Sequence, residues 1–320
     1  MKIIEKIPIF QRSDLIFLKH SINKYKFNDQ TFMELAAMEL ATNLLKHTEG
    51  GEIFILEEQT ALFIAALDKG KGITNTDLAV SRGHSTAKNS LGLGLYQLSQ
   101  KENFTFELFT LDQKNLHGTI ALIYPKNIQD NVLFYTIPFI NEDNNGDFFA
   151  QKGKFLLFGD ASGHNAKAQK SAKKVIALFF STLLSCIIIE DFFKMVHDTI
   201  KKEHLRSAVF SLIEIVKNHI SVCGVGNIAL WHCDLNENQM TILAKGIVGE
   251  KFDTIFHQTY TLDINEKLLL TTDGISKQQL KKLLTTEILK YSNLIIALGI
   301  NYFCSDGHDD SSVLVISPKE

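Results

Sequence analysis

The sequence predicts a mixed α/β (α+β) protein of two domains, one over residues 1–126 and one over residues 127–320. Three observations lead to this prediction. The chain has 320 residues, 45% hydrophobic and 22% charged, so each half is long enough to bury its own core. Helical and strand-like periodicities alternate along it. A polar, aperiodic segment with a proline, Pro125–Asn131, separates two differently patterned halves and is the expected linker.

The first half alternates helices with pairs of strands. Glu34–His47 has apolar side chains at helical spacing and good helix formers throughout, and Gly94–Gln100 predicts a second helix after a glycine-rich loop. Strands are expected at Glu52–Leu56, Thr60–Leu67, Phe104–Leu111 and Gly118–Tyr124. This order predicts a two-layer α/β sandwich.

The second half is dominated by strands. A long helix is expected from about Ala166 to Ile189, and a second helix over Asp191–Lys201. Strands are expected at Val132–Ile140, Asp147–Ala150, Phe155–Phe158, Ala208–Lys217, His219–Cys223, Ile228–Cys233, Lys267–Thr271 and Val313–Ile316. Many strands with two intervening helices predict sheets covered by helices.

Composition argues against several classes of protein. A formal net charge of -3 gives no general attraction to nucleic acid or anionic membrane. Met1–Phe10 mixes charges and a proline into its apolar residues, unlike a signal peptide. The apolar run Val175–Ile189 is shorter than the roughly 20 residues that span a bilayer, so a buried helix is expected there. The 4 cysteines lack metal-site or redox spacing. We therefore expect a cytoplasmic protein.

Four aspartates of the second half adjoin strand-like runs: Asp147, Asp160, Asp273 and Asp309. Each one alone is also typical of a turn or a cap. Together, at the ends of buried strands, they favour convergence on one point, where carboxylates repel unless hard cations such as Mg²⁺ or Mn²⁺ neutralise them. Two such ions lower the pKa of a shared water, whose hydroxide can attack phosphorus.

The first half has three segments suited to a nucleotide. Glu39 and Asn43 lie four residues apart on one predicted helix face, although a solvated polar face explains that spacing equally well. In Asp68–Ile73, glycines at alternate positions let the backbone approach a flat ligand. Ser90–Leu95 opens a helix, where free N–H groups favour phosphate.

The second half resembles the SpoIIE-type branch of the PPM phosphatases, especially its RsbX-like members. The matching segments are Gly146–Asp147, Gly159–Asp160, Ser162–His164, Gly224–Asn227, Gly246–Gly249, Thr272–Gly274 and Asp309–Asp310. The resemblance implies an αββα sandwich and metal-dependent serine/threonine phosphatase activity. It implies that Asp160 bridges two metal ions, that Asp147 binds one of them, and that Asp273 and Asp309 bind the other.

Two residues beside Asp160 complete this reading. Ala161 stands where the family usually has glycine, and the resemblance implies that its backbone carbonyl contacts a metal. His164 is interpreted as orienting water around the metals, with a direct catalytic or ligand role as the alternative.

The first half resembles the N, G1 and G2 boxes of the GHKL ATPases, whose Bergerat-type fold is a two-layer sandwich, and most closely the RsbW/RsbT-like serine kinases. The resemblance implies that Asp68 accepts a hydrogen bond from the adenine amino group and that Asn43 holds Mg²⁺, with Glu39 as the base. It also implies that Gly70 and Gly72 line the base and Gly92 and Gly94 the phosphates. The lid segment, residues 83–89, has fewer glycines than many members.

Together the halves predict a bacterial signalling protein that combines an ATP-binding serine-kinase-like domain with a phosphatase. The resemblance implies STAS-type partner-switching proteins as substrates, and a homodimer is a further expectation. The alternative is a phosphatase regulated by a domain that binds ATP and docks a partner without phosphorylating it. A sensor histidine kinase is disfavoured, because the stretch before Glu34 is too short for a helical dimerisation domain.

Overall fold

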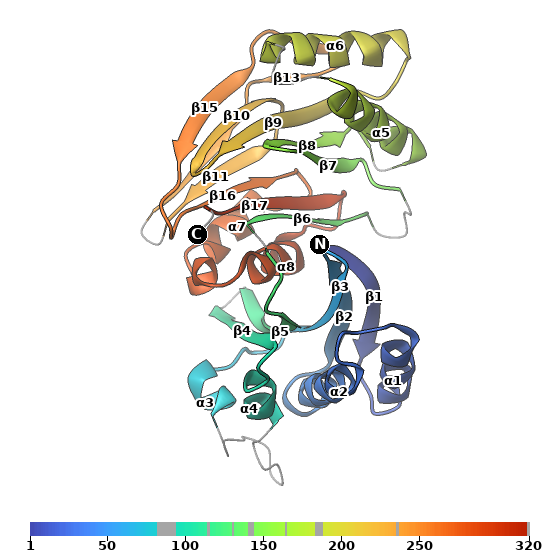
Figure 1. Ribbon diagram of the computed structural model, residues 1–320, viewed down its shortest axis with the longest axis vertical. Coiled ribbons are helices and arrows are strands. Elements are labelled where there is room, and N and C mark those ends of the chain that lie inside the picture. The colour runs from blue at the N-terminus through green and yellow to red at the C-terminus, as the bar shows by residue number, and fades with distance from the viewer. Residues whose placement is uncertain are drawn as a thin grey trace. The chain divides into compact units, whose positions relative to one another are not determined.

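The computed structural model describes residues 1–81, 94–113, 116–129, 131–139, 144–163, 165–182, 188–234 and 237–318. It divides into two compact units, Met1–Asp130 and Asn131–Glu320, which are described separately (Figure 1). Both units combine helices with antiparallel sheets, so the predicted mixed α/β class is confirmed.

The N-terminal unit holds one five-stranded antiparallel sheet in the order β1-β2-β3-β5-β4. Its strands are β1 (Lys2–Ile9), β2 (Gly51–Glu58), β3 (Ala61–Asp68), β4 (Phe104–Gln113) and β5 (Leu116–Pro125). Its helices are α1 (Asp14–Lys24), α2 (Gln30–His47), α3 (Thr76–Val80) and α4 (Gly94–Ser99). The four predicted strands and both predicted helices are confirmed. Strand β1 and helices α1 and α3 were not predicted.

Helix α2 positions the first half's candidate residues. It begins at an N-cap aspartate, Asp29, whose side chain accepts from the backbone N–H of Phe32. Its buried side chains recur every three or four residues: Phe32, Met33, Ala36, Ala37, Leu40, Ala41 and Leu44. This face packs against β2 and β3, which fixes the direction of the polar residues between them.

The C-terminal unit holds two five-stranded sheets, ordered β15-β10-β9-β8-β7 and β12-β11-β16-β17-β6. Their strands are β6 (Val132–Ile137), β7 (Asp147–Lys152), β8 (Phe155–Ala161), β9 (Ala208–Val216), β10 (His219–Val225), β11 (Ala229–Cys233), β12 (Asn238–Ile242), β15 (Phe256–Thr261), β16 (Lys267–Thr271) and β17 (Ser311–Ile316). A two-stranded hairpin joins β13 (Gly246–Ile247) to β14 (Lys251–Phe252). The helices are α5 (Ala166–Ser181), α6 (Ile189–Lys202), α7 (Lys277–Leu283) and α8 (Asn293–Cys304), with a 3₁₀ turn η1 (Glu287–Lys290).

Two hydrophobic cores order these layers. One core packs α5 and α6 against the first sheet through residues such as Val175, Phe193 and Phe210. The other joins the facing sides of the two sheets, including Phe158 and Leu270. Helix α8 packs against β6 and β17 of the second sheet. The order is therefore helix, sheet, sheet, helix, with α5 and α6 seen beside the first sheet in Figure 1.

The single helix expected from Ala166 to Ile189 is wrong. Helix α5 ends at Ser181; its C-cap Thr182 is extended, and the N–H and hydroxyl of Thr182 both donate to the carbonyl of Leu178. Residues 183–187 lie outside the described residues, and α6 starts at Ile189 after an extended Ile188. In the described part of the chain, no helix is long and apolar enough to cross a membrane. Helices α7 and α8 were not predicted.

Candidate functional site

Two of the predicted aspartates face each other across a strand pair. Asp147 opens β7 and is the register partner of Asp160 on β8, so their Cβ atoms lie about 5 Å apart on one face. Asp147 is 7% exposed, and its Oδ2 accepts from the hydroxyl of Thr272 at 2.9 Å. Its Oδ1 is buried without a hydrogen-bond partner. Such an oxygen is costly unless a ligand satisfies it.

The other predicted carboxylates are close enough to act on this pair. Burial, followed by the charges of Asp273, Asp309 and Asp310, raises the pKa of Asp160 to about 8. Burial, followed by the charge of Asp160, raises the pKa of Asp147 well above its usual range. Asp147 at the start of β7, Asp160 near the end of β8, Asp273 after β16 and Asp309 before β17 therefore lie close enough to interact electrostatically, which makes this part of the unit negative.

The strand ends that carry Asp273 and Asp309 are tied to each other. Asp273 follows β16 and accepts from the amide of Asn227 at 2.7 Å. The backbone N–H of Thr272 donates to the carbonyl of Ser312, whose N–H donates to the Thr272 hydroxyl. Glycine is required after Asp273, because a Cβ on Gly274 would lie 2.1 Å from the Asp310 carbonyl oxygen. The Asp-Gly pair is therefore more than a turn signal.

Asp310 is a residue that the sequence reading missed. It is 2% exposed, and its two carboxylate oxygens accept from the backbone N–H groups of Phe139 and Gly146, each at 2.7 Å. It thereby anchors the backbone of Gly146, the residue directly before Asp147. The available signal was the Asp309–Asp310 doublet, of which only the first residue was assigned a role.

Ala161 fits the backbone at its position. The non-glycine residues described with a positive φ are Gln59, Thr60, His204 and Lys217, so alanine is unstrained here. Its N–H donates to the carbonyl of Gly146 at 3.1 Å, and its own carbonyl lies 2.6 Å from where a Gly146 Cβ would be. The metal contact of that carbonyl stays a prediction. His164 lies outside the described residues.

The donor set suits a hard cation, although the side chains do not already form a chelating group. Among the described residues, no three His, Cys, Asp or Glu side chains lie close enough to hold a metal ion as they stand. The Oδ1 of Asp147 has no hydrogen-bond partner, and burial together with neighbouring carboxylates disfavours the charged forms of Asp147 and Asp160, so a cation bound here would be stabilised. An ion that keeps several of its waters and takes oxygen ligands, as Mg²⁺ and Mn²⁺ do, fits such a loose set.

In the N-terminal unit, a cavity of about 560 Å³ gathers five of the predicted nucleotide residues. They are Glu39, Asn43, Asp68, Gly72 and Gly94. The cavity lies between α2, the end of β3 and the start of α4. A Cβ on Gly94 would fall 1.8 Å from the Glu39 Oε1, so any larger residue there would have to displace the Glu39 side chain. Residues far apart in sequence thus share one wall.

Asp68 is the buried carboxylate of this cavity. It is 5% exposed, its Oδ1 accepts from the N–H of Gly70 at 2.7 Å, and burial raises its pKa. Gly72 has φ +77°, and a Cβ there would lie 2.3 Å from the Leu111 carbonyl oxygen. Gly70 does not line the cavity; its carbonyl contacts His117 Nδ1 at 2.8 Å. Gly92 and the lid, residues 83–89, lie outside the described residues.

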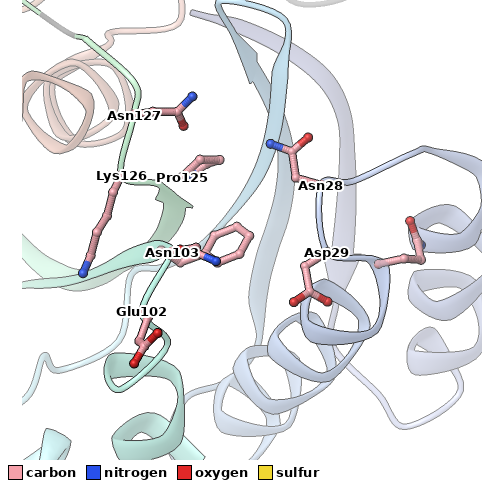
Figure 2. A pocket seen from close by; sticks show the side chains of 9 residues that line it. Asn28, Asp29, Glu102, Asn103, Pro125, Lys126 and Asn127 are labelled. Atoms are coloured by element: carbon pink, nitrogen blue, oxygen red, sulfur yellow. The ribbon is translucent and has the colours of Figure 1, made fainter.

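A second cavity, of about 660 Å³, contains none of the predicted residues. Figure 2 shows Asn28 and Asp29 on one side and Pro125, Lys126 and Asn127 on the other. Asp29 is committed to other contacts, because it caps α2 and pairs with Lys101 at 2.7 Å. We therefore assign Asp29 a structural role.

No family model matches the sequence, and neither does any curated protein. Solved structures do match. A magnesium complex of RsbX is 16% identical, with 67% of this chain and 100% of that chain covered, at a TM-score of 0.49. A bacterial stressosome structure is 20% identical over 58% and 97%, at 0.49. The catalytic domain of the serine/threonine phosphatase PstP with two manganese ions is 13% identical over 59% and 98%, at 0.45. The side chains described above, rather than these likenesses, carry the proposal below.

Proposed function

We propose that the C-terminal unit is a metal-dependent phosphoserine/phosphothreonine protein phosphatase. The observation that carries this proposal is the cross-strand pair Asp147–Asp160, with one buried carboxylate oxygen left unsatisfied. In this proposal Asp160 would be shared by two Mg²⁺ or Mn²⁺ ions, Asp147 and the Ala161 carbonyl would help to hold one, and Asp273 and Asp309 would help to hold the other. Such ions, when bound, would lower the pKa of a water and neutralise the phosphate.

The chain's own residues set the geometry of that site. Thr272 donates to one oxygen of Asp147, and Asn227 donates to one oxygen of Asp273. In this proposal the second oxygen of each carboxylate is the metal ligand. Asp310 holds the backbone N–H groups of Phe139 and Gly146. These contacts position ligands without touching the reacting atoms.

We also propose that the N-terminal unit binds ATP with Mg²⁺. The supporting observation is the cavity of about 560 Å³ in which Glu39, Asn43, Asp68, Gly72 and Gly94 meet, a size suited to a small-molecule ligand. Asp68 would accept from the adenine amino group, with Gly72 beside the base; Gly70, which does not line the cavity, would act only through its N–H to Asp68. Gly92 and Gly94 would line the phosphates. Asn43 would hold Mg²⁺, with Glu39 as the base.

The combined proposal is a signalling protein that phosphorylates and dephosphorylates STAS-type partner-switching proteins. The second candidate is a phosphatase whose ATP-binding unit only docks a partner. It is favoured by the contact between the Asn43 amide and the Glu39 carboxylate at 3.3 Å, which occupies the proposed base. In either case the phosphatase carries the hydrolysis.

The phosphatase test is Mn²⁺-dependent hydrolysis of a phosphoserine peptide by the full chain. Asp160→Asn should lower kcat by about a thousandfold, because the bridging charge is lost. Asp253→Asn, an exposed aspartate of the same unit, is the matched control and should keep the full rate. Equal rates for the unaltered chain and Asp160→Asn would sink the proposed site.

The kinase test is transfer of label from γ-labelled ATP to a STAS-domain protein. A true kinase loses transfer in Glu39→Ala while ATP binding, measured by equilibrium dialysis, persists. If the unaltered chain binds ATP and transfers no label, the docking alternative stands.

A further inference from the structure

Helix α5 presents a basic face beside the candidate metal centre. The helix contains four lysines and no carboxylate. Lys167, Lys170 and Lys174 are spaced by three and four residues, so they share one face. The buried Ser171 lies on that face, and its Oγ accepts from the backbone N–H of Arg206 at 2.8 Å. We name Lys167, Lys170, Lys174 and Arg206 the basic ridge.

Most of the ridge's charge is left unbalanced. Lys174 pairs with Glu203 at 2.5 Å. Lys167, Lys170 and Arg206 are exposed, and none of them forms an ion pair with a carboxylate of the described residues. The chain as a whole carries a net charge of -3, so the local charge of the ridge is opposite in sign to the net charge of the chain. Like-charged side chains held together in this way favour a negatively charged partner.

The ridge adjoins the segment that follows Asp160. Asn165 caps α5, with its side chain accepting from the N–H of Lys167. On the other side, Arg206 precedes Ser207, whose carbonyl accepts from the N–H of Ser162 at 2.8 Å. The Ser207 hydroxyl also bonds that of Ser162 at 2.9 Å. The basic ridge is therefore linked to the segment after Asp160 in two ways, through the Asn165 cap and through the Ser207–Ser162 hydrogen bonds.

We propose that the basic ridge binds acidic side chains flanking the phosphoserine of a protein substrate. This inference rests on the proposed phosphatase function. An extended peptide advances about 3.3 Å per residue, so residues roughly three to six positions from the phosphoserine extend about 10–20 Å along it, and we place the acidic residues there. Charge complementarity of this kind selects among substrates and speeds encounter more than it adds affinity.

The experiment compares two phosphopeptides with the same central phosphoserine, one with acidic and one with neutral residues at those positions. The full chain with Mn²⁺ should hydrolyse the acidic peptide with the higher kcat/KM. The double variant Lys167→Glu/Lys170→Glu should lower the acidic-to-neutral ratio about tenfold. The ratio should also fall towards one as salt rises to about 0.5 M, where exposed charges are screened.

The matched control is Lys281→Glu/Lys282→Glu. It makes the same charge change on α7, where Lys281 and Lys282 are also exposed, and α7 packs with α8 on the other side of the unit. It should keep the ratio within about twofold. An equal ratio in the ridge variant and the unaltered chain overturns the proposal, as does an equal loss in the control.

A binding measurement separates the ridge from the phosphatase proposal. Fluorescence anisotropy of both labelled peptides with the EDTA-treated full chain needs no hydrolysis. Tighter binding of the acidic peptide, lost in Lys167→Glu/Lys170→Glu and kept in the control, supports the ridge even if no phosphate is released. Equal binding of both peptides overturns it, whatever the hydrolysis assay gives.

Discussion

The two candidate sites are built in opposite ways. In the N-terminal unit, glycines and a short polar face surround an open cavity of about 560 Å³, which holds one buried carboxylate, Asp68. In the C-terminal unit, aspartates crowd together, and burial and mutual repulsion raise the pKa values of Asp147 and Asp160. The N-terminal site is therefore a cavity with little charge, and the C-terminal site is a cluster of negatively charged groups. Removing a carboxylate should therefore have different consequences in the two units.

Within the C-terminal unit, carboxylates that stabilise the fold can be distinguished from carboxylates that are proposed to bind a cation. Asp310 and Asp147 are neighbours in space and both buried, yet Asp310 satisfies two backbone N–H groups while Asp147 has a free oxygen. Removing a structural carboxylate should lower the free energy of unfolding. Removing a carboxylate that serves as a metal ligand should raise the free energy of unfolding of the metal-free protein.

The largest effect on stability is expected from Asp310→Ala. It leaves the N–H groups of Phe139 and Gly146 without their acceptor, and should lower the free energy of unfolding by about 3 kcal/mol. Relief of repulsion on Asp147 and Asp160 offsets part of this loss. The measurement is urea unfolding of the full chain. Asp310→Asn is the matched variant: its oxygen can still accept from one N–H group while its NH₂ faces the other, so it should lose about 2 kcal/mol. Equal losses would contradict the two-bond role.

The next effect has the opposite sign. Without metal, Asp147→Asn should raise the free energy of unfolding by about 1–2 kcal/mol, because it removes a buried charge facing Asp160 while the contact to Thr272 can persist. The same variant should lose the stabilisation that Mn²⁺ gives the unaltered chain. Thermal unfolding in EDTA and in Mn²⁺ measures both changes, with Asp253→Asn as control. A destabilised metal-free variant would count against a ligand role.

The same contrast explains what the sequence could predict. Alternating apolar residues identified most strands, and the strand ends led to Asp147 and Asp160, which the structure brings together. The role of Asp310 depends on Gly146, 164 positions away, and no local pattern contains that information. Helix α8 was missed because it is buried almost all round, so its sequence has no polar face to give a helical period. The end of α5 at Ser181 falls inside an apolar run in which no glycine, proline or charged residue marks a boundary.

A smaller effect is expected in the nucleotide cavity. Asp68→Asn exchanges an acceptor for an amide beside the Gly70 N–H and should weaken ATP binding about tenfold, since one oxygen bonds that N–H and the other is proposed to meet adenine. Equilibrium dialysis with ATP and with GTP measures it. Asp112→Asn, an exposed aspartate on β4, is the control. Unchanged ATP affinity in Asp68→Asn would remove Asp68 from the proposed site.

The smallest effect is a pH dependence of stability from Asp68. Burial raises the pKa of this carboxyl above its ordinary value of 3.8, so the folded chain holds this proton to higher pH than the unfolded chain does. Its contribution to stability is present in full below the unfolded pKa and is lost as the pH rises through the folded pKa. Asparagine at this position does not titrate. The free energy of unfolding of Asp68→Asn, taken relative to the unaltered chain, should therefore increase as the pH rises from about 3 to 7. Urea unfolding of both proteins across that range measures the difference, and a difference that decreases with pH would show that the Gly70 and Thr119 hydrogen bonds outweigh burial.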